Sequence, residues 1–205
     1  VSAGVHLYRL ALACRDQGLS GVEFLASIPG TVGGALIMNA GFSRFRGQRN
    51  EMGPLVLDVE WLDPEGVKRV LKRDDLRFSY RSSNLKGKVL LSATLQLWPR
   101  AEEEVEREIR ANFQYRSKEQ DVRYPSSGSI FKNPSEGQLT AGQLIEGVGL
   151  KGARKGGAMV SQQHANFMIN TGGAKSSDFI ALIEYVQQAV SNATGIFLEP
   201  EVLIV

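Results

Sequence analysis

The chain has 205 residues, which is enough for one large domain or two small ones. A formal net charge of +2 does not supply the broad basic face that nucleic-acid binding needs. The apolar runs are far shorter than the ~20 residues that cross a bilayer, so no membrane segment is expected. Cys14 is the only cysteine, which excludes an internal disulfide and favours a reducing compartment such as the cytoplasm.

The first hundred residues predict one helix, a glycine-rich segment and several strands. Apolar positions within residues 5–18 recur at helical spacing, and Gly18 suits the end of that helix. Partial alternation on both sides of the turn at 63–66 predicts a β-hairpin over 55–71, and 89–97 predicts a further strand. The inward face of the helix is expected to consist of Leu7, Leu10, Ala11 and Cys14.

A change of composition near Arg100 predicts a domain boundary, with domains at 1–100 and 101–205. The second range opens on a charged helix over 101–114, and it lacks the regular strand–helix alternation of a doubly wound sheet. The fold class is therefore expected to be α+β. The other elements expected here are one helix face with Val105, Ile109 and Phe113 on the charged helix, a short helix capped by Thr140, a strand over 165–170, a helix capped by Ser176 or Ser177 and closed by Gly195, and a terminal strand over 197–205.

The glycine-rich segment over residues 28–41 is the first candidate for ligand binding. Gly30, Gly33 and Gly34 lack a Cβ atom, so the backbone can approach a flat or charged ligand and donate N–H groups to it. Asn39-Ala40-Gly41 adds an amide side chain. The spacing matches neither a P-loop nor a Gly-x-Gly-x-x-Gly turn. A tight turn between packed elements explains these glycines as well.

Two further segments carry polar side chains suited to an anionic ligand. Arg81 offers a fixed cation beside an anionic substrate or a developing oxyanion, although an arginine in a turn is usually a surface charge. Ser129 offers a hydroxyl, and Lys132 and Asn133 add a charge and an amide that suit a phosphate-bearing ligand. A polar turn is the alternative for this second segment.

The terminal segment and one histidine complete the candidates. Strand periodicity places Glu199 and Glu201 on one face, and a carboxylate in an apolar strand needs a partner or a catalytic role. A solvated edge strand is the alternative. No cysteine or acidic cluster lies near His164, so no metal site is expected there, and a histidine of this kind is more often packed or on the surface than catalytic.

Together, four motifs resemble those of the UDP-N-acetylenolpyruvoylglucosamine reductase family. They follow one another in that family's order, with similar spacing, and the resemblance runs over essentially the whole chain, which makes it highly specific. The motifs are Ile28-Pro29-Gly30-Thr31-Val32-Gly33-Gly34-Ala35 with Asn39-Ala40-Gly41, Phe78-Ser79-Tyr80-Arg81-Ser82-Ser83, Gly128-Ser129-Ile130-Phe131-Lys132-Asn133-Pro134, and Leu198-Glu199-Pro200-Glu201-Val202.

The resemblance implies a fold, an activity and a place for each role. The fold would be the later part of a PCMH-type FAD-binding domain followed by a smaller α+β substrate-binding domain. The activity would be the NADPH-dependent, FAD-mediated reduction of UDP-N-acetylglucosamine enolpyruvate to UDP-N-acetylmuramate, in the synthesis of peptidoglycan precursors. The short loop over 82–87 resembles the subtype that lacks a long loop bearing a substrate-clamping tyrosine.

The same resemblance implies roles for individual residues. Arg81 and Glu201 would stabilise an enolate-like intermediate, and Ser129 would protonate the carbon next to the one that receives hydride. The substrate-binding positions implied are Tyr80, Lys118, Asn133 and His164. The FAD-contacting positions implied are Ile28, Pro29, Gly30, Gly33, Gly34, Asn39 and Gly41.

The chain departs from the family pattern in one respect. It contains no loop of the Gly-x-Gly-Ser-Asn type, which in the family holds the FAD diphosphate. We therefore expect a preceding segment in the natural protein, and expect this chain to associate with that segment or with itself. Two alternative functions stay open at this point, a sugar-nucleotide-binding fragment without catalysis and another flavin oxidoreductase of the same superfamily.

Overall fold

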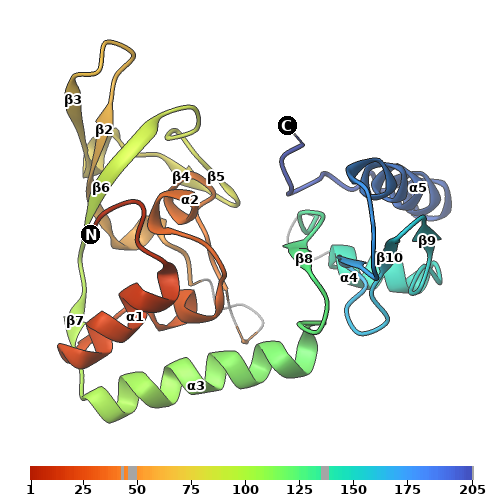
Figure 1. Cartoon of the computed structure of the whole chain (residues 1–205), viewed down its shortest axis with the longest axis horizontal. Coiled ribbons are helices and arrows are strands. Elements are labelled where there is room, and N and C mark those ends of the chain that lie inside the picture. Colours follow the sequence, from red (N-terminus) through yellow and green to blue (C-terminus); the bar gives the residue numbers. More distant parts are fainter. Residues whose placement is uncertain (43, 46–49, 135–138, 205) are drawn as a thin grey trace. The chain divides into compact units, whose positions relative to one another are not determined.

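The computed structural model describes residues 1–42, 44–45, 50–134 and 139–204. The chain divides into two compact units, unit 1 over Val1–Tyr115 and unit 2 over Arg116–Val205 (Figure 1). Both units mix helices and antiparallel strands, which confirms the α+β class. The predicted boundary at residue 100 coincides with the start of a long helix, α3 (Glu102–Glu119), whereas the division between the compact units falls within that helix.

Unit 1 is built from two short helices, the first part of α3 and small antiparallel sheets. Its helices are α1 (Leu7–Asp16) and α2 (Val32–Ile37), with 3-10 turns at Glu23–Ser27, Gly53–Leu55 and Arg73–Asp75. Its strands are β1 (Leu19–Ser20), β2 (Val56–Leu62), β3 (Lys68–Lys72), β4 (Phe78–Ser79), β5 (Ser82–Ser83), β6 (Val89–Leu95) and β7 (Trp98–Pro99).

The largest sheet of unit 1 has the order β3-β2-β6, and all its pairs are antiparallel (Figure 1). β2 and β3 form the predicted hairpin around the turn, where the Asp63 carboxylate accepts a hydrogen bond from the Val67 N–H at 2.8 Å. The predicted strand at 89–97 is confirmed as β6, followed by β7. The inward face of α1 is also confirmed, because the buried residues of this helix are Leu7, Leu10, Ala11 and Cys14.

The start of α3 packs against α1. Val105 and Ile109, two of the three residues predicted to share one face, form a buried cluster with Ala11 and Ala26. The third, Phe113, is 42% exposed, and its ring makes an edge contact with the ring of Tyr8, with 5.7 Å between ring centres. The helical period alone does not tell where a helix runs past the end of the layer that it covers.

Unit 2 contains a four-stranded antiparallel sheet with the order β8-β11-β10-β9, together with two helices (Figure 1). The second helix packs against both the first helix and the sheet. The fully buried residues of this core include Phe131, Ile145, Leu182 and Leu198. The elements are β8 (Ser126–Ser129), α4 (Ala141–Gly147), β9 (Arg154–Lys155), β10 (Ala158–Val160), β11 (Phe167–Asn170) and α5 (Ser176–Thr194).

The ends of both helices in unit 2 follow from local chemistry. Thr140 caps α4 as predicted, with its hydroxyl accepting from the Gln143 N–H at 3.2 Å. Gly195 ends α5 in the left-handed conformation, also as predicted. The predicted cap of α5, Ser176 or Ser177, was wrong, because Lys175 is the N-cap and Asp178 accepts from the Lys175 N–H at 3.0 Å. The Asp178 carboxylate, at the third position of the helix, thus accepts a hydrogen bond at this end of α5, in place of a capping serine hydroxyl.

The predicted terminal strand over 197–205 was wrong. In the described part of this segment only an isolated bridge forms, between Phe131 and Pro200. The Ile130 N–H, which could extend this pairing at Glu201, donates instead to the Asn166 carbonyl. Val205 lies outside the described residues.

Candidate functional site

The arginine motif of unit 1 forms a tight hairpin. β4 and β5 pair in antiparallel fashion, and Tyr80 and Arg81 stand at the tip. Arg81 has a φ of 54°, a left-handed conformation that is uncommon for residues other than glycine. Its guanidinium lies 5.1 Å from the centre of the Tyr80 ring, and its Nη2 donates to the Gly41 carbonyl at 3.1 Å. The arginine motif and the end of the glycine motif are therefore joined by a direct contact.

Asn39 fixes the same region from inside the unit. Its side chain is buried, and its Nδ2 donates to Glu51 at 2.9 Å and to the Ser79 carbonyl at 3.0 Å. Its Oδ1 accepts from the Gly53 N–H at 2.8 Å. Both the amide and the carbonyl of Asn39 thus serve contacts within unit 1, which explains its presence without a ligand. Its predicted contact with a cofactor stays a prediction.

The glycine motif contains two kinds of position. Gly33 is buried, its N–H donates to the Ala3 carbonyl at 2.8 Å, and a Cβ at this position would lie 3.2 Å from that of Ala3. Close packing therefore accounts for Gly33. Gly30 differs, because it is exposed, has a φ of 146° and has no atom within 4 Å of where a Cβ would stand. Pro29 and Gly34 are exposed beside it, and together they present bare backbone to the surroundings.

The serine motif of unit 2 lies at the end of an edge strand. Ser129 is the last residue of β8 and pairs with Phe167 of β11. Its side chain is half-buried, and no hydrogen bond from its hydroxyl is found in the part of the chain that the structure describes. The preceding residue, Gly128, has a φ of 82°, a conformation that favours glycine. Ser129 therefore carries a hydroxyl that is held in place by backbone pairing and is available to a ligand.

The terminal glutamate motif runs beside the serine motif. The Glu201 N–H donates to the Ile130 carbonyl at 2.7 Å, and the Lys132 N–H donates to the Glu199 carbonyl at 2.9 Å. The Lys132 ammonium also forms an ion pair with the Glu199 carboxylate. The two glutamates predicted to share a face therefore differ in environment: Glu199 is exposed and paired, whereas Glu201 is half-buried.

Asn133 links the serine motif to α4. Its Oδ1 accepts from the Ala141 N–H, the first of the helix, at 3.1 Å. On the next residue of α4, Gly142, a Cβ would stand 3.7 Å from the His164 ring. Unit 2 thus brings Ser129, Asn133, His164 and Glu201 into one connected set of contacts, although they are spread over more than seventy positions of the sequence.

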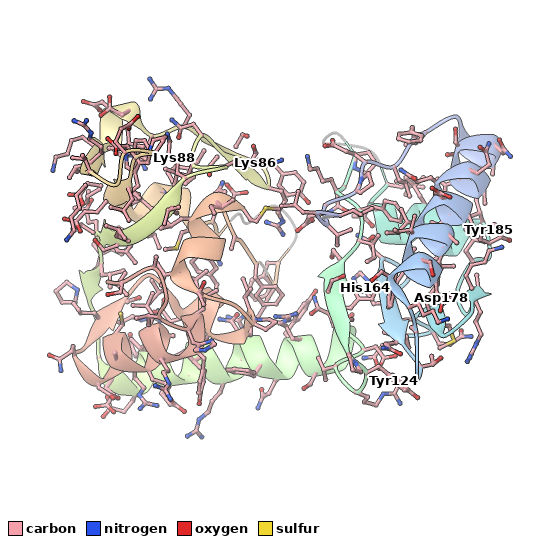
Figure 2. All side chains as sticks on the ribbon, turned by 45° about the horizontal axis from the view of Figure 1, so that its top comes forward. Lys86, Lys88, Tyr124, His164, Asp178 and Tyr185 are labelled. Atoms are coloured by element: carbon pink, nitrogen blue, oxygen red, sulfur yellow. The ribbon has the colours of Figure 1, made fainter. Side chains whose placement is uncertain are left out.

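His164, labelled in Figure 2, lies on the turn between β10 and β11. Its ring packs on Phe167 with 4.7 Å between ring centres. The turn is held by Ser161, whose hydroxyl donates to the buried carboxylate of Asp121 at 3.0 Å and accepts from the His164 N–H at 3.3 Å. The backbone of Lys118 meets the same turn, because its carbonyl accepts from the Gln163 side chain at 2.7 Å. The Lys118 side chain itself is exposed.

Two buried residues that hold this region together, Asp121 and Asn166, were not predicted from the sequence. Asp121 is buried, and burial by itself raises the pKa of its carboxyl. Hydrogen bonds from Arg123 and Ser161 outweigh this effect, so the pKa lies below its ordinary value. Asn166 is buried and bonds to the backbone of Phe131. Neither position belongs to a periodic pattern. The only available signal was an asparagine between apolar residues just before a strand.

The protonation of His164 gives a testable pH dependence. Burial lowers the pKa of His164, the nearby Lys151 acts in the same direction, and Glu119 and Glu146 oppose both. The unfolded chain takes up this proton near its ordinary pKa of about 6.5, whereas folded unit 2 resists it. Unfolding therefore takes up a proton in the window below that value. The stability present above it should be lost as the pH falls toward the lower folded pKa.

We expect His164→Gln to flatten this acid loss of stability, measured between pH 7.5 and 5 by hydrogen exchange of the β10 and β11 core amides. His6→Gln is the control, because His6 is the other histidine, is exposed and lies in unit 1. An unchanged pH profile in His164→Gln would contradict the assignment.

Two negative findings apply to the described residues alone. No helix among them is long and apolar enough to cross a membrane. No group of three or more metal-ligating side chains among them is arranged to hold a metal ion.

Comparison with known proteins agrees with these motifs. Residues 120–205 match the family model described as UDP-N-acetylenolpyruvoylglucosamine reductase, C-terminal domain. The reductase of that name from Anoxybacillus flavithermus is 41% identical over 100% of this chain and 67% of its own length. The one from Alkalilimnicola ehrlichii is 45% identical over 99% of this chain and 66% of its own length.

A solved structure agrees as well. The crystal structure of UDP-N-acetylenolpyruvylglucosamine reductase (MurB) from Thermus caldophilus superposes with a TM-score of 0.82 at 38% identity, over 97% of this chain and 69% of that one. The two-unit α+β fold and its motifs thus define an oxidoreductase scaffold whose second unit corresponds to the C-terminal domain of these reductases. The chain belongs to the UDP-N-acetylenolpyruvoylglucosamine reductase family, and it spans about two thirds of the length of the curated relatives it matches.

Proposed function

We propose that this chain carries the substrate-handling part of a reductase that converts UDP-N-acetylglucosamine enolpyruvate to UDP-N-acetylmuramate, with FAD and NADPH. The observation that carries the proposal is the connected set in unit 2. Ser129 directly precedes Ile130, whose carbonyl accepts from the Glu201 N–H, and Asn133 follows three residues later and accepts from the first N–H of α4. Membership of the family and the names of the relatives support the substrate and the reaction.

The fit of FAD to unit 1 is partial. The exposed backbone at Pro29, Gly30 and Gly34 suits close approach of a flat ring, because among the described residues no atom lies within 4 Å of where a Cβ of Gly30 would stand. The Gly33 N–H and the Asn39 side chain form hydrogen bonds within unit 1, so we assign to both the role of shaping the glycine-rich segment. We therefore assign ring contacts to Ile28, Pro29, Gly30, Gly34 and Gly41, and a supporting part to Gly33 and Asn39.

When bound, FAD would supply the hydride that originates from NADPH. Reduction of a carbon–carbon double bond needs one proton in addition, and Ser129 is placed by the proposal as its donor, at the carbon next to the one that receives hydride. As hydride adds, negative charge develops on the carboxylate of the substrate. The Arg81 guanidinium would neutralise this charge, and a protonated Glu201 would donate a hydrogen bond to it.

The UDP-sugar is assigned to polar groups around the same set. Asn133 and His164 both lie near the start of α4, and both offer hydrogen bonds without a net charge at neutral pH. Lys118 supplies an exposed ammonium for the diphosphate. Tyr80 of unit 1, with an exposed ring and hydroxyl, is assigned to the substrate by the family resemblance alone. These substrate contacts are part of the proposal.

Calorimetry with UDP and the 205-residue chain tests the binding part. We expect measurable heat and 1:1 binding, and a weaker affinity by about tenfold, or 1.4 kcal/mol, in Asn133→Ala. Asn192→Ala is the matched control, because Asn192 is an exposed asparagine on α5 whose side-chain carbonyl accepts a hydrogen bond from the neighbouring Gln188 side chain. Folded protein that gives no heat and no competition between UDP and the UDP-sugar would exclude this binding role.

Turnover tests the reaction itself. The gene product that carries these residues should oxidise NADPH only when UDP-N-acetylglucosamine enolpyruvate is supplied, and should form UDP-N-acetylmuramate. Binding of UDP without turnover would favour a sugar-nucleotide-binding fragment. Turnover of a different unsaturated acid would favour another flavin oxidoreductase of the same superfamily.

A further inference from the structure

Asn166 connects the two halves of the site in unit 2 through the backbone of one buried residue. It is 4% exposed, and its side chain makes two hydrogen bonds to Phe131: Oδ1 accepts from the N–H at 3.0 Å, and Nδ2 donates to the carbonyl at 2.8 Å. The carbonyl of Asn166 also accepts from the Ile130 N–H at 2.9 Å. A single residue thus meets three polar groups of the stretch Ile130–Phe131.

The same stretch is held from another side by the terminal motif. The Ile130 carbonyl accepts from the Glu201 N–H at 2.7 Å, and Phe131 forms the bridge to Pro200. Ser129 immediately precedes the stretch. The position of Ser129 relative to Glu201 is therefore set by two residues whose remaining backbone groups are bonded to Asn166.

The side chain of Asn166 does what a strand backbone does elsewhere in a sheet. An amide offers one donor and one acceptor with the spacing of a peptide group, so it can pair with a residue where the regular ladder stops. The regular pairing of β8 with β11 ends at Ser129 and Phe167, next to Asn166. Within the two strands it is irregular, with a register shift between Phe167 and Ile169. Asn166 continues the pairing beyond the last paired residues, Ser129 and Phe167.

We propose that Asn166 is a positioning residue, which holds Ser129 and Glu201 at a fixed separation by clamping Ile130–Phe131. The inference rests on the proposed function for the roles of Ser129 and Glu201. The clamp itself does not, since it is a statement about hydrogen bonds. Asn166 touches no reacting atom in this scheme, and its effect is transmitted through Phe131.

Three variants in the gene product that carries these residues separate positioning from folding. Asn166→Ala removes both side-chain bonds to Phe131. Asn166→Asp keeps the acceptor for the Phe131 N–H, but sets a carboxylate oxygen against the Phe131 carbonyl. Asn170→Ala is the matched control, because Asn170 ends β11, the strand that Asn166 directly precedes, and its Oδ1 accepts from Gly172 and Ala174 at the turn beyond that end.

The first readout is hydrogen exchange, which does not depend on activity. Asn166→Ala should speed exchange of the Ile130, Phe131 and Glu201 amides at least about tenfold relative to the control variant, because they lose a shared restraint. Unchanged exchange at these three amides in folded protein overturns the clamp, whatever the protein catalyses.

The second readout is turnover at saturating substrate. Asn166→Ala should lower kcat at least about tenfold and Asn170→Ala by less than about twofold, with flavin reduction by NADPH unchanged in both. Asn166→Asp should regain kcat relative to the parent protein as the pH falls, because a protonated carboxyl can donate to the Phe131 carbonyl.

The combined outcomes distinguish the two claims. A kcat in Asn166→Ala equal to that of Asn170→Ala, with exchange altered as expected, overturns the positioning role. If the parent protein does not reduce the UDP-sugar, the proposed function fails, while hydrogen exchange still decides whether the clamp exists. Should Asn166→Ala not fold, the pH-dependent kcat of Asn166→Asp decides the positioning role in its place.

Discussion

Replacement of Ser129 by alanine should slow reduction of the UDP-sugar at least about 10²-fold, and leave hydride uptake from NADPH nearly unchanged. General acid catalysis by a positioned group typically contributes roughly 10²–10⁴-fold to a rate. Ser129 is held at the end of β8 by its pairing with Phe167, and its hydroxyl makes no hydrogen bond in the described part of the chain. Alanine keeps the pairing and removes only the hydroxyl. Stopped-flow absorbance of the flavin, with the two half-reactions followed separately, measures both rates.

Ser126→Ala is the matched control for this experiment. Ser126 begins the same strand, pairs with Ile169 and is exposed. Its loss should change neither half-reaction by more than about twofold, as expected for a surface change away from special features. If Ser129→Ala reduced the UDP-sugar at the parental rate, the proton donor would have to be another group.

The sequence was sufficient to predict helices and strands in which apolar residues recur at regular spacing. The buried stripe of α1 follows from spacing, because one face of this helix meets the core. The hairpin of β2 and β3 follows from partial alternation on both sides of the turn at 63–66. The Thr140 cap of α4 follows from local chemistry within four residues. Spacing does not show how far along a helix the buried face extends, as at Phe113. An apolar run does not show whether a segment pairs along its length, as at Pro200.

The candidate site was predictable to a different degree. Ser129, Asn133 and Glu201 stand in motifs that a family resemblance can identify, and their connection in unit 2 agrees with that identification. Asn166 was not found, because it bonds to a residue 35 positions away. Such a bond leaves no local pattern. A buried asparagine and a turn asparagine look the same in a sequence, and only the partner distinguishes them.

Asn39 shows the same limit and gives the second large prediction. The sequence marks it as a ligand-contacting amide, whereas its side chain joins Glu51, Ser79 and Gly53, which lie 12, 40 and 14 positions away. Removing it leaves the buried Gly53 N–H without its acceptor, whereas Ser79 is exposed and its carbonyl can bond to water instead. Each buried polar group that loses its partner costs about 1–3 kcal/mol.

Asn39→Ala should therefore destabilise unit 1 by about 2–4 kcal/mol. The buried Gly53 N–H, left without a partner, supplies about 1–3 kcal/mol of this loss. A further ~1 kcal/mol comes from the left-handed backbone at this position, where φ is 44° and alanine is disfavoured. Asn39→Gly should lose the same hydrogen bonds without that strain, so the difference between the two variants measures the backbone part. Urea denaturation followed by tryptophan fluorescence reports unit 1, because both tryptophans, Trp61 and Trp98, lie there.

Asn84→Ala is the control, since Asn84 also makes two hydrogen bonds to backbone, at Arg77 and Asp75, but is exposed. Water can replace those bonds, so its loss should stay within about 1 kcal/mol. The contrast between two asparagines with similar bonding then isolates the effect of burial. A destabilisation in Asn39→Ala no larger than in Asn84→Ala would contradict the structural role of Asn39. Its side chain would then be explained better by the ligand contact that the sequence suggested, because the groups around it would have found water without loss.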